Sequence, residues 1–176
     1  MRAALLVGLL CMPGIASAQA RLPKGQAEVN RASALMVRGQ YAQAEPLLRQ
    51  AVVDAPNDPY AHFNLASLLR ATGRSDQSIA SYERARDLFE TQGPRANGAG
   101  DISNCLYGIA LALEASGDPR AAAQAWNDYI RFAQRYESGH PAIAIAREHV
   151  DTNLRVARAS GPFRGAQEAT RPHTTR

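Results

Sequence analysis

Histidine and cysteine are the residues of this sequence with the widest chemical capacity, since they bind metals and act as bases or nucleophiles. The four histidines are His62, His140, His149 and His173. No two of them are four residues apart, the spacing that places two zinc ligands on one helical face. The sequence also lacks the Gly-x-Ser-x-Gly elbow of serine hydrolases and a Gly-x-x-x-x-Gly-Lys phosphate loop. We therefore expect no catalytic residue, no metal ion and no cofactor.

The two cysteines, Cys11 and Cys105, have different expected fates. Cys11 lies in an N-terminal segment that we expect to be removed, which leaves Cys105 without an intramolecular disulfide partner. A nucleophilic thiolate needs a nearby base or cation that lowers its pKa, and no sequence pattern supplies one. We interpret Cys105 as a small apolar residue buried on a helix, because free cysteine is among the most often buried residue types.

The N-terminal residues have the pattern of an export signal. Arg2 precedes a short apolar run over residues 3–12, a Pro-Gly pair follows, and Ala16-Ser17-Ala18 fits a small-x-small cleavage site. We expect residues 1–18 to be a signal peptide, with cleavage after residue 18 or 20. Because the apolar run is too short to span a bilayer, no transmembrane segment is expected after cleavage.

Composition and charge narrow the class of protein further. With 45% hydrophobic and 20% charged residues, the chain has ordinary globular composition. Most of its net charge of +4 comes from Arg2 and from the residues after 159, so residues 21–159 are close to neutral. We expect no nucleic-acid partner, since such partners bind clustered basic patches. All but one of the 20 basic residues are arginine, a bias that is common in GC-rich bacterial sequences. Together with the export signal, this bias leads us to expect a soluble bacterial protein that is periplasmic or secreted.

An internal repeat of 34 residues determines the expected architecture. Residues 25–58 align with 59–92 without a gap, and a third copy at 103–136 follows a ten-residue insertion at 93–102. With each copy numbered 1 to 34, small residues recur at positions 8 and 20, large apolar residues at positions 11 and 24, and glycine at position 15. In that order these residues are Ala32, Ala66 and Ala110; Ala44, Ser78 and Ala122; Leu35, Leu69 and Leu113; Leu48, Tyr82 and Trp126; and Gly39, Gly73 and Gly117.

Each copy is expected to be a helical hairpin. Small residues at positions 8 and 20 let two antiparallel helices cross closely, and glycine at position 15 supplies the left-handed conformation that ends the first helix. Asp58-Pro59 and Asp118-Pro119 have the cap-then-proline pattern of a helix start, and Ser75 and Asp101 are expected to cap two further helices. The expected helices are 25–38, 41–54, 59–71, 75–91, 102–116 and 119–135, with a mobile loop over residues 93–100.

A seventh helix at residues 141–158 follows the third copy. Its apolar stripe, which consists of Ile143, Ala146, Val150, Leu154 and Ala157, recurs at three- and four-residue steps. Such a helix would cap the last hairpin, as solenoids require. Ile145 and Val156 lie off this stripe and indicate a second, weaker contact face. Beyond it the periodicity stops, so residues 159–176 are expected to be a disordered tail.

The repeat pattern resembles that of the tetratricopeptide repeat (TPR) family, and Pro56 matches that family's frequent proline at position 32. The resemblance implies an all-α superhelix, or solenoid, with three TPR hairpins and a C-terminal capping helix in one domain over residues 25–158. It also implies a concave groove lined by positions 2, 5, 9, 12 and 13 of each first helix. The expected groove residues include Val29, Ser33, Met36, Tyr60, Phe63, Ser67, Arg70, Asn104, Tyr107, Leu111 and Glu114.

The resemblance implies a binding function. Val29, Phe63 and Tyr107 share position 5 and would form an apolar row, or would instead serve packing. Arg70 and Glu114 share position 12 and would pair with each other or hold charges of a ligand. The carboxylate clamp of chaperone-binding members is absent, since only Asn64 of its five residues is present.

The leading hypothesis is a non-enzymatic adaptor or assembly scaffold of the bacterial cell envelope that binds a protein or peptide segment of unknown identity. The alternative is a self-associating structural protein, a homo-oligomer that uses Ile145 and Val156 of the capping helix.

The export signal predicts the mass of the mature protein. If signal peptidase removes residues 1–18 or 1–20, the intact mass of the exported chain corresponds to an N-terminus at Gln19 or Arg21. We expect no lipid on Cys11, because Leu10 precedes it where lipidation signals usually have a small residue. A mass that retains residues 1–18, or one with acyl groups on Cys11, contradicts the prediction.

Overall fold

Seven α-helices make up the described part of the computed structural model, which comprises residues 23–91, 98–136 and 142–160. The helices are α1 (Gln26–Val37), α2 (Tyr41–Asp54), α3 (Pro59–Ala71), α4 (Ser75–Thr91), α5 (Gly98–Ser116), α6 (Pro119–Tyr136) and α7 (Ala142–Ala159). These residues contain no β-strand, and the expected all-α class is confirmed. The signal segment and most of the expected tail lie outside the described residues.

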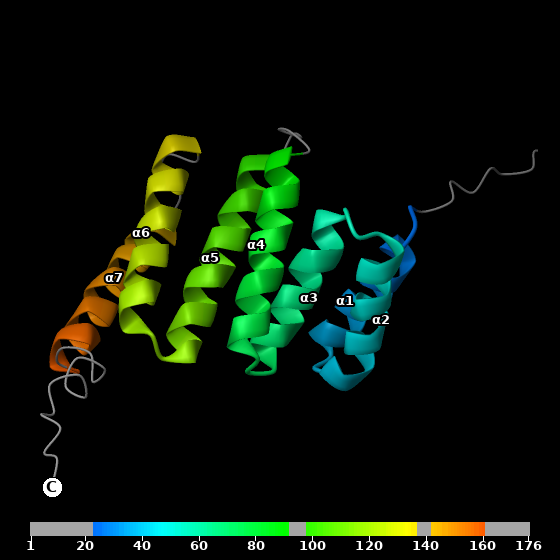
Figure 1. Cartoon of the computed structure of the whole chain (residues 1–176), viewed down its shortest axis with the longest axis horizontal. Coiled ribbons are helices and arrows are strands. Elements are labelled where there is room, and N and C mark those ends of the chain that lie inside the picture. Colours follow the sequence, from blue (N-terminus) through cyan, green and yellow to red (C-terminus); the bar gives the residue numbers. More distant parts are fainter. Residues whose placement is uncertain (1–22, 92–97, 137–141, 161–176) are drawn as a thin grey trace, which may run out of the picture.

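The helices form a row, from the hairpin of α1 and α2 at one end to α7 at the other (Figure 1). Each helix packs mainly against the next one along the chain, and α3 also contacts α1 and α5. Because contacts link neighbouring hairpins, each hairpin depends for its stability on those beside it. This arrangement is the expected superhelix of helical hairpins.

The small residues at positions 8 and 20 lie where the two helices of each hairpin cross. They are Ala32, Ala44, Ala66, Ser78, Ala110 and Ala122, and all six are fully buried. The Ser78 hydroxyl donates to the carbonyl oxygen of Ala66 at 2.8 Å, so its burial leaves no unpaired donor. The close packing of protein interiors leaves no room for a larger side chain here.

Helix starts and ends follow the local signals of the sequence. The Asp58 carboxylate accepts a hydrogen bond from the Tyr60 backbone N–H at 3.0 Å, and Asp118 accepts from the backbone of Arg120 at 3.1 Å. The glycines at position 15, which are Gly39, Gly73 and Gly117, have φ values of 71°, 77° and 81°. The expected caps at Asp58 and Asp118 and the left-handed glycines are therefore confirmed.

Some expectations for helix starts and for the apolar stripe of α7 are wrong. Ser75 is the first residue of α4 and not the cap before it. Helix α5 begins at Gly98, so residues 98–100 are not loop and Asp101 lies in the first turn instead of capping the helix. Asp101 accepts a hydrogen bond from the Tyr60 hydroxyl at 2.8 Å, and this contact with α3 helps to offset the low helix propensity of the glycines. In α7, Leu154 was expected in the buried apolar stripe but is 37% exposed, and its neighbour Asn153 is buried instead, at 8% exposed. The reason is the hydrogen bond that the Asn153 amide donates to the Glu114 carboxylate on α5.

An ion pair also joins the first two hairpins. The Arg74 guanidinium donates to both carboxylate oxygens of Glu45, at 2.6 and 2.8 Å. The hydrogen bond from Arg74, with help from Arg49, lowers the pKa of Glu45 to about 2. Glu45 is therefore ionised at neutral pH and ties α2 to the segment that leads into α4.

The positive φ of Gly73 predicts a cost for a side chain at this turn. No atom lies within 4 Å of the place that a Cβ would occupy, so Gly73→Val introduces backbone strain without a clash. We expect the free energy of unfolding to fall by at least about 1 kcal/mol. Gly73→Asn is the control and loses less, because asparagine tolerates the left-handed region. Equal denaturant midpoints for wild type and Gly73→Val would contradict the assigned turn.

Candidate functional site

One face of α1, α3 and α5 is continuous across the three hairpins. Positions 2, 6, 9 and 13 of a copy lie on the same side of a helix, because they are spaced by about whole turns. We call this the first-helix face, and it consists of Gln26, Asn30, Ser33 and Val37; Tyr60, Asn64, Ser67 and Ala71; and Asn104, Gly108, Leu111 and Ala115. Of these residues, Gly108 alone is buried. The face is thus open along the row of helices.

The expected apolar row at position 5 is not part of this face. Val29 is 4% exposed and belongs to the core formed by α1, α2 and α3, which favours the packing alternative for this residue. The Phe63 ring packs edge-on against Tyr82 at 5.5 Å, and the Tyr107 ring packs against Trp126 at 4.9 Å. At each of these positions the second helix of the same hairpin covers the side chain, so the residues serve packing.

The expected polar residues Ser33 and Ser67 do lie on the face, and both are hydrogen-bonded within the chain. The Ser33 hydroxyl donates to the Asn64 side-chain oxygen at 3.1 Å, and the Asn64 amide donates to the Tyr60 carbonyl oxygen at 2.8 Å. Ser67 shares a hydrogen bond with the Tyr82 hydroxyl at 2.9 Å. A network of side chains thus links α1 to α3, and Asn64 belongs to it although it was not among the expected groove residues.

The remaining expected residues have different environments. Tyr60 connects three helices, since its hydroxyl donates to Asp101 on α5 and its ring lies edge-on to Phe89 on α4 at 5.0 Å. Met36 and Leu111 are half-buried against core clusters. Asn104 is exposed. Of these, Asn104 is the most accessible to a partner.

Gly108 has a steric role at the seam between the second and third hairpins. A Cβ at this position would lie 2.5 Å from the Tyr82 ring, well inside van der Waals contact. Glycine is therefore what allows the Tyr82 ring to pack here while its hydroxyl reaches Ser67. The close contact explains structurally why a chaperone clamp residue is missing at this position.

Glu114 is a structural residue that does not pair with Arg70. Its Oε1 atom accepts hydrogen bonds from the Trp126 indole at 2.9 Å, from His149 Nδ1 at 2.8 Å and from the Asn153 amide. The His149 ring also stacks on Trp126, with centroids 4.5 Å apart. One carboxylate oxygen thus holds α5, α6 and α7 together.

Helix α7 extends the first-helix face by one more element. The Asn153 amide donates to the His149 carbonyl oxygen four residues before it, as Asn64 does to Tyr60, so Asn153 corresponds to position 6 and Val156 to position 9. Val156 and Ile145 are 49% and 48% exposed. In the sequence, the feature that indicates this extension is the position of Ile145 and Val156 off the main apolar stripe of the capping helix.

The reactive groups of the described residues do not form a chemical centre. Cys105 is fully buried, and burial, with a smaller effect of Asp101, raises the pKa of its thiol to about 12. No group of three or more metal-binding side chains occurs in the described ranges. In the same part of the chain, no helix has both the length and the apolar character for a membrane crossing.

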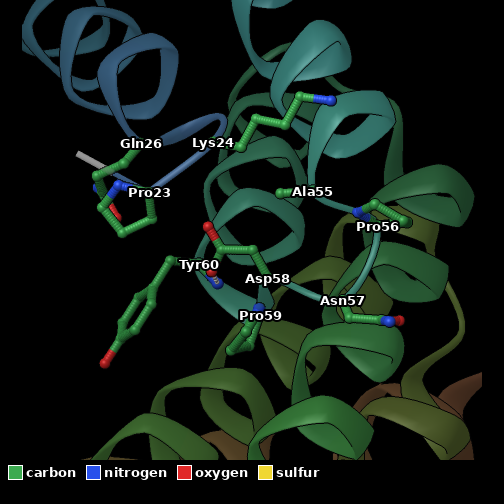
Figure 2. A pocket seen from close by; sticks show the side chains of 9 residues that line it. All are labelled: Pro23, Lys24, Gln26, Ala55, Pro56, Asn57, Asp58, Pro59 and Tyr60. Atoms are coloured by element: carbon green, nitrogen blue, oxygen red, sulfur yellow. Dashed lines mark hydrogen bonds between the residues drawn. The ribbon is translucent and has the colours of Figure 1, made fainter. Parts of the chain in front are cut away.

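A hollow of about 440 Å³ lies at the N-terminal end of the row (Figure 2). Its walls come from the start of α1, the α2–α3 connection and the start of α3. The lining residues are Pro23, Lys24, Gln26, Ala55, Pro56, Asn57, Asp58, Pro59 and Tyr60. Asp58 is occupied in capping α3, and the hollow adjoins the first-helix face through Gln26 and Tyr60.

Comparison with known proteins supports the assignment of the repeats. Residues 29–94 match the family model of the tetratricopeptide repeat. The crystal structure of the Sgt2 TPR domain from Aspergillus fumigatus is similar in fold, with a TM-score of 0.60, 20% sequence identity, and coverage of 90% of this chain and 92% of that one. No curated protein matches the chain in sequence.

The Glu114 cluster predicts a large loss of stability on removal of one carboxylate. Glu114→Leu leaves the buried Trp126 indole and one of the two Asn153 amide donors unpaired, and we expect the free energy of unfolding to fall by about 2 kcal/mol or more. Glu148→Leu on the exposed side of α7 is the control and changes it by less than about 0.5 kcal/mol. Similar losses in urea denaturation of the two variants would show that the cluster does not hold α7.

Proposed function

Because the chain carries tetratricopeptide repeats in an all-α superhelix, we propose that it is a non-enzymatic scaffold that binds a protein segment on its first-helix face in the bacterial cell envelope. The observation that carries this proposal is the open face along α1, α3, α5 and α7. Solenoid repeats typically use such extended surfaces for recognition. The fold is typical of interaction modules.

Two further observations support the finer parts of the proposal. The proposed location in the cell envelope rests on the export pattern of residues 1–20. The non-enzymatic character is supported by Ser33, Asn64 and Ser67, whose side chains are engaged in hydrogen bonds with one another, with the backbone or with Tyr82 of α4. Side chains bonded in this way fix the geometry of the face, and none of them is an activated nucleophile or base.

Site-specific photo-cross-linking in the native cell tests the assigned face. A benzophenone amino acid in place of Ala71, Asn104 or Val156 is expected to give discrete adducts with a partner protein. The same group in place of Ala80 or Gln124, which are exposed on the second helices α4 and α6, is expected to give none. Adducts from the second-helix positions alone would contradict the proposal.

A second candidate function, self-association, is favoured by one observation. Ile145 and Val156 are both about half exposed on α7. If this surface joins two copies of the chain, the adduct formed from position 156 has twice the mass of the chain, whereas positions 71 and 104 give none. The mass of the adduct therefore separates the two candidates.

A further inference from the structure

The first-helix face carries no charged side chain. None of its residues on α1, α3 and α5 is Asp, Glu, Lys or Arg, although these four types make up 20% of the chain. The second helices differ, since Glu83 on α4 and Arg131 on α6 are charged and exposed. The residues that extend the face on α7 are also of other types, and these are His149, Asn153 and Val156. Among the described residues, the charges thus lie around this face and not on it.

The carboxylates that border the face have donors within the chain. Asp101 accepts a hydrogen bond from the Tyr60 hydroxyl at 2.8 Å. Glu114 accepts from Trp126 and from two residues of α7. Arg70 stands at position 12, about 90° around the helix from the middle of the face, and its Nε atom is shielded from solvent. The borders therefore do not change the uncharged character of the face.

The two edges of the face differ in polarity. Because α1, α3 and α5 each begin a hairpin, equal positions of the three repeats lie at the same edge. Position 13, near the ends of these helices, has exposed aliphatic side chains, and these are Val37, Ala71 and Ala115. Position 2, near their starts, has amide and phenol groups, and these are Gln26, Tyr60 and Asn104. The face thus has an uncharged polar edge and an apolar edge, and Val37 at the apolar edge is 89% exposed.

Amide side chains at the polar edge have hydrogen-bonding capacity left. Asn104 is exposed, and its side chain forms no hydrogen bond in the described part of the chain. The Gln26 amide donates to the Asn30 side-chain oxygen at 2.9 Å, which leaves the Gln26 oxygen and the Asn30 donors open. An amide offers both donors and acceptors. These groups can therefore bind uncharged polar groups of a partner without an opposite charge.

We infer that the first-helix face binds a segment of another protein whose contacting side chains are uncharged, an inference that rests on the proposed function. A charged side chain that packs against this face loses water and gains no opposite charge, and an unpaired charge is costly to bury. Uncharged polar side chains match the amides at position 2, and apolar side chains match the aliphatic groups at position 13. The segment is therefore polar on one side, apolar on the other and without charge along the face.

The C-terminal residues of the chain itself do not have this composition. Residues 161–176 contain Arg164, Glu168, Arg171 and Arg176. They are therefore richer in charge than the chain as a whole, in which 20% of residues are charged. This mismatch favours an occupant from another protein over the chain's own tail.

A selection from random 16-residue peptides displayed on phage, with the purified chain as bait, tests the inference. We expect the selected peptides to contain Asp, Glu, Lys and Arg at no more than half the frequency of the unselected library. The affinity of a synthetic selected peptide should change less than twofold between 50 mM and 500 mM NaCl, because salt screens ion pairs and leaves uncharged contacts in place.

Substitutions of Ala71 separate the effect of charge from that of bulk. Ala71 is exposed on the face at the end of α3. Ala71→Lys should weaken peptide binding at least tenfold, whereas Ala71→Gln, which adds bulk without charge, should keep affinity within threefold. Ala80→Lys on the exposed side of α4 is the control and should keep affinity within twofold. Ala71→Lys should melt no lower than Ala71→Gln, because a cation in the last turn of a helix is favourable.

The outcomes also distinguish this inference from the proposed function. If selected peptides cross-link to positions 71 and 104 but share a charged residue, or lose more than twofold affinity in salt, the face binds segments and the uncharged partner is wrong. Equal affinities of Ala71→Lys and Ala71→Gln also overturn the inference. If the peptides cross-link to positions 80 and 124 instead, or if none is selected, the proposed function fails as well. An adduct of twice the chain's mass from position 156 would assign the face to a second copy and overturn both.

Discussion

The close crossing of paired helices at small, fully buried residues is the constraint on which the rest of this structure depends. Ala32 and Ala44 meet this requirement in the first hairpin, and in the second Ser78 does so by donating its hydroxyl to the Ala66 carbonyl. A hairpin closed in this way still has apolar surface on the side of its neighbour. Each hairpin therefore stabilises the next, and α7 covers the last of them with Ala146 and Val150.

The seams between neighbouring hairpins differ in chemistry although the repeats share one spacing. A hydrogen bond between Ser33 and Asn64 joins α1 to α3. The seam between the second and third hairpins uses the contact of the Tyr82 ring with Gly108. The last seam uses the Glu114 carboxylate. Because each seam is filled differently, the first-helix face changes in character along the row of helices.

Among the described residues, most of the large aromatic side chains serve packing, which leaves few of them on the first-helix face. Phe63 and Tyr107 lie edge-on to aromatic rings of their own second helices, a geometry that stabilises aromatic pairs. Trp126 is fully buried and its indole nitrogen is satisfied by Glu114. With these rings packed inward, Tyr60 is the one aromatic residue of the first-helix face, which otherwise presents a mixture of polar residues such as Asn104 and apolar residues such as Leu111.

The sequence alone determined the helices and their pairing, because the signals for both act within one hairpin. The expected ranges 41–54, 59–71 and 75–91 coincide with α2, α3 and α4. Caps, left-handed glycines and small crossing residues lie at fixed distances along the chain, so spacing reveals them. Only the tertiary structure decided which side chains turn inward and which charges are paired. Glu114 meets Asn153 across 39 residues and Tyr60 meets Asp101 across 41, and the spacing of a repeat does not specify which side chain of the next hairpin fills such a gap.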